Sequence, residues 1–363
     1  MNSCTKDVKI KAKGNEFMFD QILAWYNDLP NSLVGALVLF IMGVLLLIKG
    51  GDWFVDSAVG IAKRFHVPEI IIGATVVSIG TTLPEVMVSV TAAVNDNGAI
   101  AYGNAIGSII CNTALIAALT IAIRPAPINK KAVSLPVVFF FVSAAIYIVA
   151  AYIFDRFDRW LGIVMLLVFA IYMTVTIYKG FKQPAKPEGT PEPEKIEEQE
   201  SGSLAKCLIV LIISAALIAI GADMLEGSSV SLALMAGIPT EVVGVTIVAL
   251  CTSLPELVTA VTALLKGHGA LSLGNIIGAN IFNLVLVSGA AVTISPFEIP
   301  EGSKLLGYNT SQLVEIPLMV TVMAIMTLPA LIKGKLRRWQ GLALLGIYVV
   351  FVVMQVLIAT GSI

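Results

Sequence analysis

Long apolar segments separated by short polar loops dominate the chain. Most of them are nearly uncharged over about 17 residues or more, enough to cross a bilayer core of about 30 Å. The pattern therefore predicts an all-α polytopic membrane protein with ten transmembrane helices. The expected segments are 33–64, 69–94, 99–123, 133–153, 161–179, 204–234, 241–265, 270–294, 312–332 and 340–359.

The ten segments divide into two groups of five. Residues 182–203 carry four prolines and six glutamates with almost no apolar residue, which predicts a disordered linker. We expect a polar N-terminal tail over 1–20, a first repeat over 21–181 and a second repeat over 204–363. Because five is odd, the second group would enter the membrane from the opposite side. The prediction is an inverted-topology repeat, an arrangement that many secondary transporters share.

A duplicated stretch supports the two repeats. Residues 73–115 align without a gap on residues 244–286 at a constant offset of 171, and 19 of the 43 positions are identical. Each copy begins with a Gly…Thr-Thr/Ser-Leu-Pro-Glu segment that ends at Glu85 or Glu256. Such a match exceeds what a shared apolar composition produces, so it indicates an internal duplication.

Each copy places one carboxylate, Glu85 or Glu256, in the middle of an apolar segment. An ionisable residue at membrane depth is costly, so it indicates a functional site. A buried structural carboxylate satisfied by hydroxyls is the alternative, and the duplication argues against it. The net charge of −1 speaks against nucleic-acid binding, and the four scattered cysteines suggest neither a disulfide framework nor a zinc site. We expect no cofactor and no obligatory protein partner.

Oxygen-bearing side chains surround both glutamates. Thr81 and Thr82 precede Glu85 by four and three residues, which puts their hydroxyls on or near the carboxylate face of a helix. Pro84 lacks an N–H and would free the carbonyl of Gly80, so we expect a broken helix there. The second copy repeats this set with Thr252, Ser253 and Glu256. Hydroxyl, carbonyl and carboxylate oxygens are the ligands of hard cations.

The second part of each copy supplies further polar residues. Asn112 and Asn283 lie eight residues beyond the Gly-Asn pairs at Asn104 and Asn275, about 12 Å along a helix. Ser108 is one turn before Asn112. We expect Asn112 and Asn283 at the depth of the glutamates, with plain interhelical hydrogen bonding as the alternative. The Gly-Asn pairs themselves are interpreted as helix starts.

Basic residues set the expected orientation. If the N-terminus is outside, the cytoplasmic loops hold 15 Lys and Arg and the opposite loops hold three. This asymmetry follows the positive-inside rule. We therefore expect a multi-pass protein of the plasma membrane with both termini outside and the 182–203 linker in the cytoplasm. Asp52 and Asp223, which match across the repeats, are expected to be satisfied by Lys49 or water.

These motifs resemble the α-repeats of the sodium/calcium exchangers in the calcium/cation antiporter superfamily, in their short prokaryotic form. The resemblance implies a transporter, not an enzyme, with a midplane site where Na⁺ and Ca²⁺ compete. It implies two carboxylate ligands, five hydroxyl ligands, two asparagine amides at the corners of the ion site, and two backbone-carbonyl ligands. In that order these are Glu85 and Glu256; Thr81, Thr82, Thr252, Ser253 and Ser108; Asn112 and Asn283; and Ser78 and Ala249.

The chain departs from the family pattern at four positions. Cys251 stands opposite Gly80, Thr82 replaces the more usual serine, Ala279 replaces a usual hydroxyl, and Asn283 replaces the acid that potassium-dependent exchangers need. Potassium transport is therefore not expected. A Ca²⁺/H⁺ antiporter of the same superfamily remains the nearest alternative, although its usual Gly-Asn-Ala-x-Glu context is absent. A cation channel and an intramembrane aspartyl protease are the alternatives from other classes.

Overall fold

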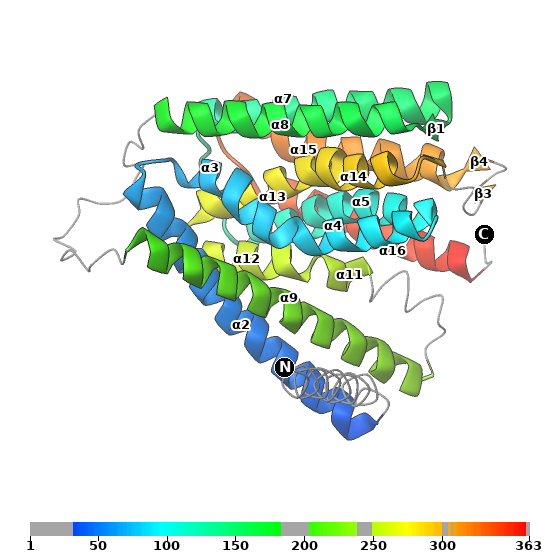
Figure 1. Cartoon of the computed structure of the whole chain (residues 1–363), viewed down its shortest axis with the longest axis horizontal. Helices are drawn as coiled ribbons and strands as arrows, with labels where there is room; N and C mark the ends of the chain where they lie inside the picture. Colours follow the sequence, from blue (N-terminus) through cyan, green and yellow to red (C-terminus); the bar gives the residue numbers. More distant parts are fainter. Residues whose placement is uncertain (1–31, 183–202, 238–248, 300–303, 306–307, 361–363) are drawn as a thin grey trace, which may run out of the picture.

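The computed structural model describes residues 32–182, 203–237, 249–299, 304–305 and 308–360 as an elongated helical bundle (Figure 1). Two short antiparallel pairs lie at one end. Strand β1 (Arg156–Phe157) pairs with β2 (Phe297–Glu298), and β3 (Lys304–Leu305) pairs with β4 (Tyr308–Asn309). We call this the hairpin end. The opposite end, where the first repeat ends and the second begins, is the linker end.

The first repeat contains the five predicted segments. They are α2 (Leu33–Arg64); α3 (Glu69–Ile72), η2 (Gly73–Val77) and α4 (Ser78–Val94); α5 (Gly98–Cys111), η3 (Asn112–Ala117) and α6 (Ala118–Ile123); α7 (Lys130–Val149) and η4 (Ala150–Phe154); and α8 (Arg159–Lys182). The η elements are π-helical turns: η2 and η3 lie inside continuous helices, and η4 ends the helix that α7 begins. Every predicted boundary lies within a few residues of the observed one.

The second repeat follows the same order. Its elements are α9 (Leu204–Met235); α11 (Ala249–Thr252) and α12 (Leu254–Leu265); α13 (Gly269–Phe282), η6 (Asn283–Val287) and α14 (Ser288–Ile294); η7 (Ser311–Glu315) and α15 (Ile316–Lys333); and α16 (Arg338–Ala359). Nine helices of the described residues are long and apolar enough to cross a membrane. The seventh expected segment is described only from Ala249. The expected tail over 1–20, residues 183–202 of the expected linker and residues 241–248 lie outside the described residues.

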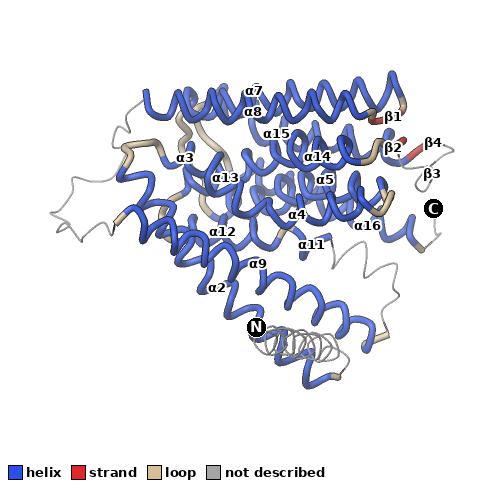
Figure 2. The backbone as a smooth tube through the Cα atoms, in the orientation of Figure 1, coloured by secondary structure: helices blue, strands red, loops and turns tan. Residues whose placement is uncertain are grey.

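Helices α2 and α9 form a pair that runs obliquely to the other helices (Figure 1; Figure 2 gives the helix and loop boundaries). A Cβ atom on Gly43 would lie 2.8 Å from the carbonyl oxygen of Gly221, and one on Gly50 would lie 3.2 Å from that of Ser214. The 171-residue offset exchanges Gly43 with Ser214 and Gly50 with Gly221. The Gly43–Gly221 contact and the Gly50–Ser214 contact are therefore equivalent by the repeat. This equivalence places a pseudo-twofold axis between α2 and α9.

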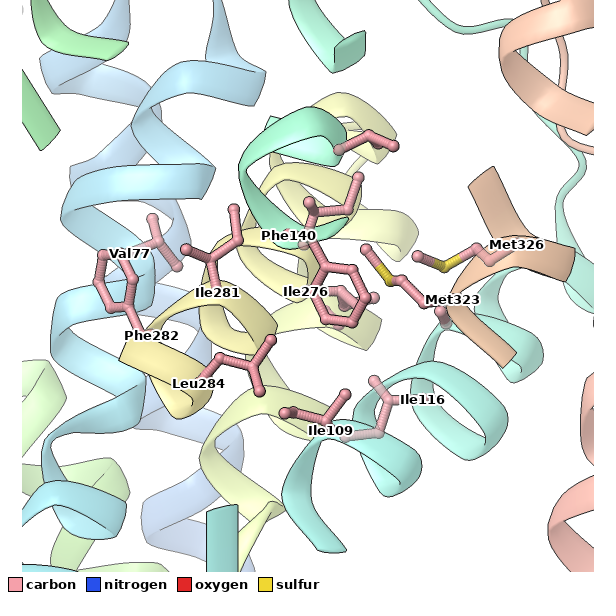
Figure 3. Close-up of a cluster of buried hydrophobic side chains, with 14 of the residues drawn as sticks. Val77, Ile109, Ile116, Phe140, Ile276, Ile281, Phe282, Leu284, Met323 and Met326 are labelled. Atoms are coloured by element: carbon pink, nitrogen blue, oxygen red, sulfur yellow. The ribbon is translucent and has the colours of Figure 1, made fainter. Parts of the chain in front are cut away.

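Helix α13 occupies the centre of the bundle. Its residues Ile276, Ile281 and Phe282 are buried among side chains of the first repeat and of α15 (Figure 3). Its glycines allow close approach to η2 and α3: a Cβ atom on Gly274 would lie 2.2 Å from the carbonyl oxygen of Ile70, and one on Gly278 would lie 2.3 Å from the Ser78 hydroxyl. The second repeat thereby packs directly against the first-repeat motif.

An ion pair joins α2 to the end of α12 on the linker side. The Lys266 ammonium lies 2.8 Å from the Asp56 carboxylate and 3.5 Å from that of Asp52, and it donates to the Asp52 carbonyl at 3.0 Å. The basic group beside Asp52 is therefore Lys266 from the other repeat, and not the expected Lys49. The repeat equivalent of Lys266 is the uncharged Asn95. This ion pair therefore has no counterpart at the hairpin end.

Candidate cation-binding site

Glu85 and Glu256 meet in the middle of the bundle. Glu85 lies on α4 and Glu256 in the first turn of α12, and both are fully buried. Their carboxyl groups are close enough to interact electrostatically. Within the described residues, no Lys, Arg or His forms an ion pair with either. Two buried like charges repel each other, so the pair requires a cation or a proton.

The two helices that carry the glutamates differ in shape. Helix α12 is separated from α11 at Ser253, two residues before Pro255, as the expected break requires. In the first repeat that expectation is wrong, because α4 continues through Pro84. The irregularity lies upstream instead, in the wide turn η2, where the Ser78 hydroxyl donates to the Gly73 carbonyl at 2.8 Å. Such π-helical turns are frequent at functional sites.

One of the predicted hydroxyl residues contacts a carboxylate directly, and three others are buried. The Thr82 hydroxyl donates to a Glu256 carboxylate oxygen at 3.3 Å, which is a direct contact between the repeats. Thr81, Ser108 and Ser253 are buried. The hydroxyls of Ser108 and Ser253 have no hydrogen-bond partner among the described residues. Thr252 is half-buried.

Asn112 and Asn283 occupy equivalent places at the starts of η3 and η6. Both are fully buried, and neither amide nitrogen nor amide oxygen has a hydrogen-bond partner within the described part of the chain. The alternative of plain interhelical hydrogen bonding finds no support in this geometry. Among the described residues, nine of the fourteen buried side-chain atoms without a partner belong to the predicted site residues. Buried polar atoms in native proteins have partners, so this concentration indicates a ligand site.

Ser78 and Ala249 flank the site at equivalent positions. Ser78 begins α4, and its hydroxyl contacts the Asn275 carbonyl at 3.0 Å in addition to Gly73. Ala249 begins α11, and residues 241–248 before it lie outside the described part. The structure therefore brings Ser78 to the interface between the repeats and places Ala249 at a helix end.

Asn275 is a polar residue of the site that the sequence interpretation assigned to a helix start. That interpretation is wrong for Asn275 and for Asn104, because each is the seventh residue of its helix. The Asn275 side-chain oxygen accepts from Thr81 at 3.2 Å and lies 3.3 Å from the Ser78 hydroxyl, while its nitrogen donates to Thr259 at 3.0 Å. The duplication itself was the available signal, since Asn275 and Asn104 are identical at equivalent positions.

Asn104 has a different role from its counterpart. Its side-chain nitrogen donates to the backbone carbonyl of Glu85 at 3.0 Å and to the Ser89 hydroxyl at 2.9 Å. It therefore stabilises the backbone that carries Glu85 and does not contact the hydroxyls across the repeat interface.

A groove of about 710 Å³ leads toward the site between the α2–α9 pair and the α4 and α11 helices. Its lining is mostly apolar, with three polar contributors: Asp223 and Glu226 from α9 and Thr252 from α11. Pro84 and Pro255, each the residue before a site glutamate, also line it. Among the described residues no group of three or more His, Cys, Asp or Glu could hold a metal ion.

Comparison with known proteins places this arrangement in a family. The model of the sodium/calcium exchanger protein family matches residues 35–178 and 206–357. The chain is 31% identical to the sodium/calcium exchanger MaX1 of Methanosarcina acetivorans, covering 87% of this chain and 97% of that one. It is 34% identical to the inner membrane protein YrbG of Escherichia coli over 77% of this chain and 81% of that one.

The fold agrees with a solved exchanger. A structure of the sodium-calcium exchanger NCX_Mj soaked with Na⁺ and Sr²⁺ superposes with a TM-score of 0.72 at 30% identity, covering 88% of this chain and 98% of that one. The match extends over both repeats and confirms the multi-pass helical membrane fold. The family is one of transporters, so the chain is not an enzyme. The chain belongs to the sodium/calcium exchanger protein family.

Proposed function

We propose that the protein exchanges Na⁺ for Ca²⁺ across the membrane by alternating access to one site between Glu85 and Glu256. The observation that carries the proposal is the meeting of two fully buried carboxylates, one from each repeat, with no basic partner in the described part of the chain. Similarity to MaX1 and NCX_Mj, both named as sodium/calcium exchangers, supports it.

The charge of the site suits both ions. Two carboxylates supply −2, which one Ca²⁺ or two Na⁺ would neutralise, so the ions would compete. A third Na⁺ would leave a net charge of +1, and the exchange would then move charge across the membrane. Ca²⁺ takes six to eight oxygen ligands in flexible geometry. The proposed ligands are Glu85, Glu256, Thr81, Thr82, Thr252, Ser253, Ser108, Asn112 and Asn283, with the backbone carbonyls of Ser78 and Ala249.

The asymmetry of the bundle suggests how access alternates. The groove beside Thr252 provides a route to the site, while Lys266 ties α2 to the core at the linker end through Asp52 and Asp56. Because α2 and α9 pack on each other along glycine contacts, we infer that they move as one unit. A movement that broke the Lys266 ion pair would open the linker side and close the groove.

Ca²⁺ uptake into proteoliposomes tests this function. Uptake of ⁴⁵Ca²⁺ should follow an imposed Na⁺ gradient and should not follow an imposed pH gradient of the same free energy. Glu298→Gln, at an exposed position on β2, is the matched control and should transport normally. Uptake driven by the pH gradient alone would instead identify a Ca²⁺/H⁺ antiporter. Uptake without any counter-ion gradient would identify a channel.

A further inference from the structure

A carboxylate outside the central site lies at the hairpin end. Glu315 is the last residue of η7 and is half-buried. The Gln355 side chain of α16 donates to one of its oxygens at 3.1 Å, and no Lys, Arg or His pairs with it among the described residues. Its repeat equivalent is Ala144, so the duplicated site does not account for it.

Two buried tyrosines, Tyr102 and Tyr147, lie beside Glu315. Tyr102 of α5 faces Glu315 and Ser311, and its ring centroid is 6.3 Å from that of Tyr147. Tyr102 and Tyr147 are 2% and 1% exposed, and neither hydroxyl has a hydrogen-bond partner within the described residues. A buried hydroxyl without a partner is costly, so these two tyrosines favour a bound group that supplies one.

Side-chain contacts link this cluster to the backbone of Asn283. Tyr147 faces Ser288, the first residue of α14. The Ser288 hydroxyl donates to the backbone carbonyl of Asn283 at 2.9 Å and fills the wide turn η6. A change of charge near Tyr147 therefore reaches the backbone that orients the Asn283 amide.

We propose that Glu315, Tyr102, Tyr147 and Ser311 form a second site that binds one unit of positive charge, as Na⁺ or as a proton, and that acts on Asn283 through Ser288. The charge of its single carboxylate balances one monovalent cation. Its other cation ligands would be hydroxyl oxygens, which suit a hard ion. An unpaired carboxylate in a membrane helix is costly unless such a charge neutralises it. The effect on Asn283 rests on the proposed function, whereas binding at Glu315 does not.

The other titratable and polar groups around this cluster have contacts of their own. Tyr152 of η4 faces Tyr102 and donates to the Gln312 carbonyl. Asp155 is reached only through Gln312, whose side-chain nitrogen donates to its carboxylate at 3.0 Å. From α16 the contact is the uncharged Gln355. Of the described groups named here, Glu315 is therefore the one carboxylate that faces Tyr102 and Tyr147.

Infrared difference spectroscopy of reconstituted protein tests the binding. The background is the double variant Glu85→Gln/Glu256→Gln, which removes the central carboxylates. One arm adds Na⁺ at constant pH, and the other lowers pH without Na⁺. A carboxylate band that responds in the Na⁺ arm identifies Na⁺, and one that responds only in the pH arm identifies a proton. The band should vanish on adding Glu315→Gln and persist on adding the control Glu298→Gln. Identical spectra for the two triple variants in both arms would overturn the proposal.

A transport assay tests the coupling in the otherwise native chain. Glu315→Gln and Tyr147→Phe should each shift the Na⁺ or proton dependence of Ca²⁺ uptake by about threefold or more, and Glu298→Gln should not. Size-exclusion chromatography and thermal unfolding establish that the variants are folded. Unchanged dependence in folded Glu315→Gln protein would contradict the coupling, even if the infrared band confirms binding. Failure of all Ca²⁺ exchange in wild type would instead contradict the proposed function and leave the infrared result standing.

Discussion

The Thr81 hydroxyl of the first repeat donates a 3.2 Å hydrogen bond to the Asn275 side-chain oxygen of the second. The same oxygen lies 3.3 Å from the Ser78 hydroxyl, so one amide orients two hydroxyls. Because Asn275 is also anchored by its bond to Thr259, its position is fixed within its own repeat. The contact therefore holds two candidate ligands of one repeat in register with the other.

Replacing Asn275 should weaken Ca²⁺ binding without abolishing it. Asn275→Ala removes the acceptor for the Thr81 hydroxyl, and a neutral hydrogen bond contributes about 1 kcal/mol, or about fivefold in affinity. Equilibrium Ca²⁺ binding to the purified protein measures the effect. Asn95→Ala, at an exposed loop position, is the control. Equal affinities for the two variants would show that Asn275 does not position the site.

Neutralising Lys266 should shift the balance between the two access states. Lys266→Met removes its pairing with Asp52 and Asp56, and partly exposed pairs contribute up to about 1 kcal/mol, or about fivefold in population. Cys251 lines the groove, so its rate of modification by a thiol reagent reports this population once the other cysteines are replaced. The rate should fall several-fold.

The control for Lys266 is a second linker-end lysine. Lys335 is exposed and forms no ion pair within the described residues. Lys335→Met should leave the Cys251 rate unchanged. An unchanged rate in Lys266→Met as well would show that this ion pair does not close the linker side.

Adding an acid at Asn283 should make transport depend on pH. Asn283→Asp gives the site a third carboxylate, and three clustered carboxylates cannot all remain ionised cheaply without cations. As pH falls the added acid takes up a proton, so inhibition should deepen toward low pH. Initial rates of Ca²⁺ uptake from pH 6 to 8 under one Na⁺ gradient compare the variant with wild type. Superimposable normalised profiles would remove Asn283 from the ligand set.

The distribution of basic residues predicts the orientation of the chain in the membrane. We expect both termini and the hairpin end outside, because Lys and Arg concentrate in the loops of the linker end. In a background without native cysteines, a membrane-impermeant thiol reagent should label Glu298→Cys on intact cells and should not label Lys335→Cys. The reverse pattern would invert the topology.

The helices could be predicted because a membrane leaves few alternatives for an apolar segment. A run such as 69–94 must satisfy its backbone internally, and the structure places helix over Glu69–Val94. The two glutamates were also predictable, since the duplication marks them. The helix break predicted at Pro84 was wrong. Helix α4 is continuous through Pro84, and the wide turn lies at Gly73–Val77 instead.

Contacts between the repeats could not be predicted from sequence. Asn275 meets Thr81 across 194 residues, and Lys266 meets Asp56 across 210. No local periodicity encodes such pairs, because they depend on how the two repeats dock. Glu315 was missed for a related reason, since it lacks a repeat partner and its neighbours come from α5 and α16.

The central claim is that Glu85 and Glu256 together bind one Ca²⁺ that Na⁺ displaces. Equilibrium binding of ⁴⁵Ca²⁺ to purified wild type, Glu85→Gln, Glu256→Gln and the control Glu298→Gln tests it most directly. Removing one partner of a buried charged site costs about 3–5 kcal/mol, so each site variant should lose at least about 100-fold in affinity. Wild type and Glu298→Gln should bind one Ca²⁺ per chain in competition with Na⁺. Wild-type affinity in either folded site variant would contradict the account.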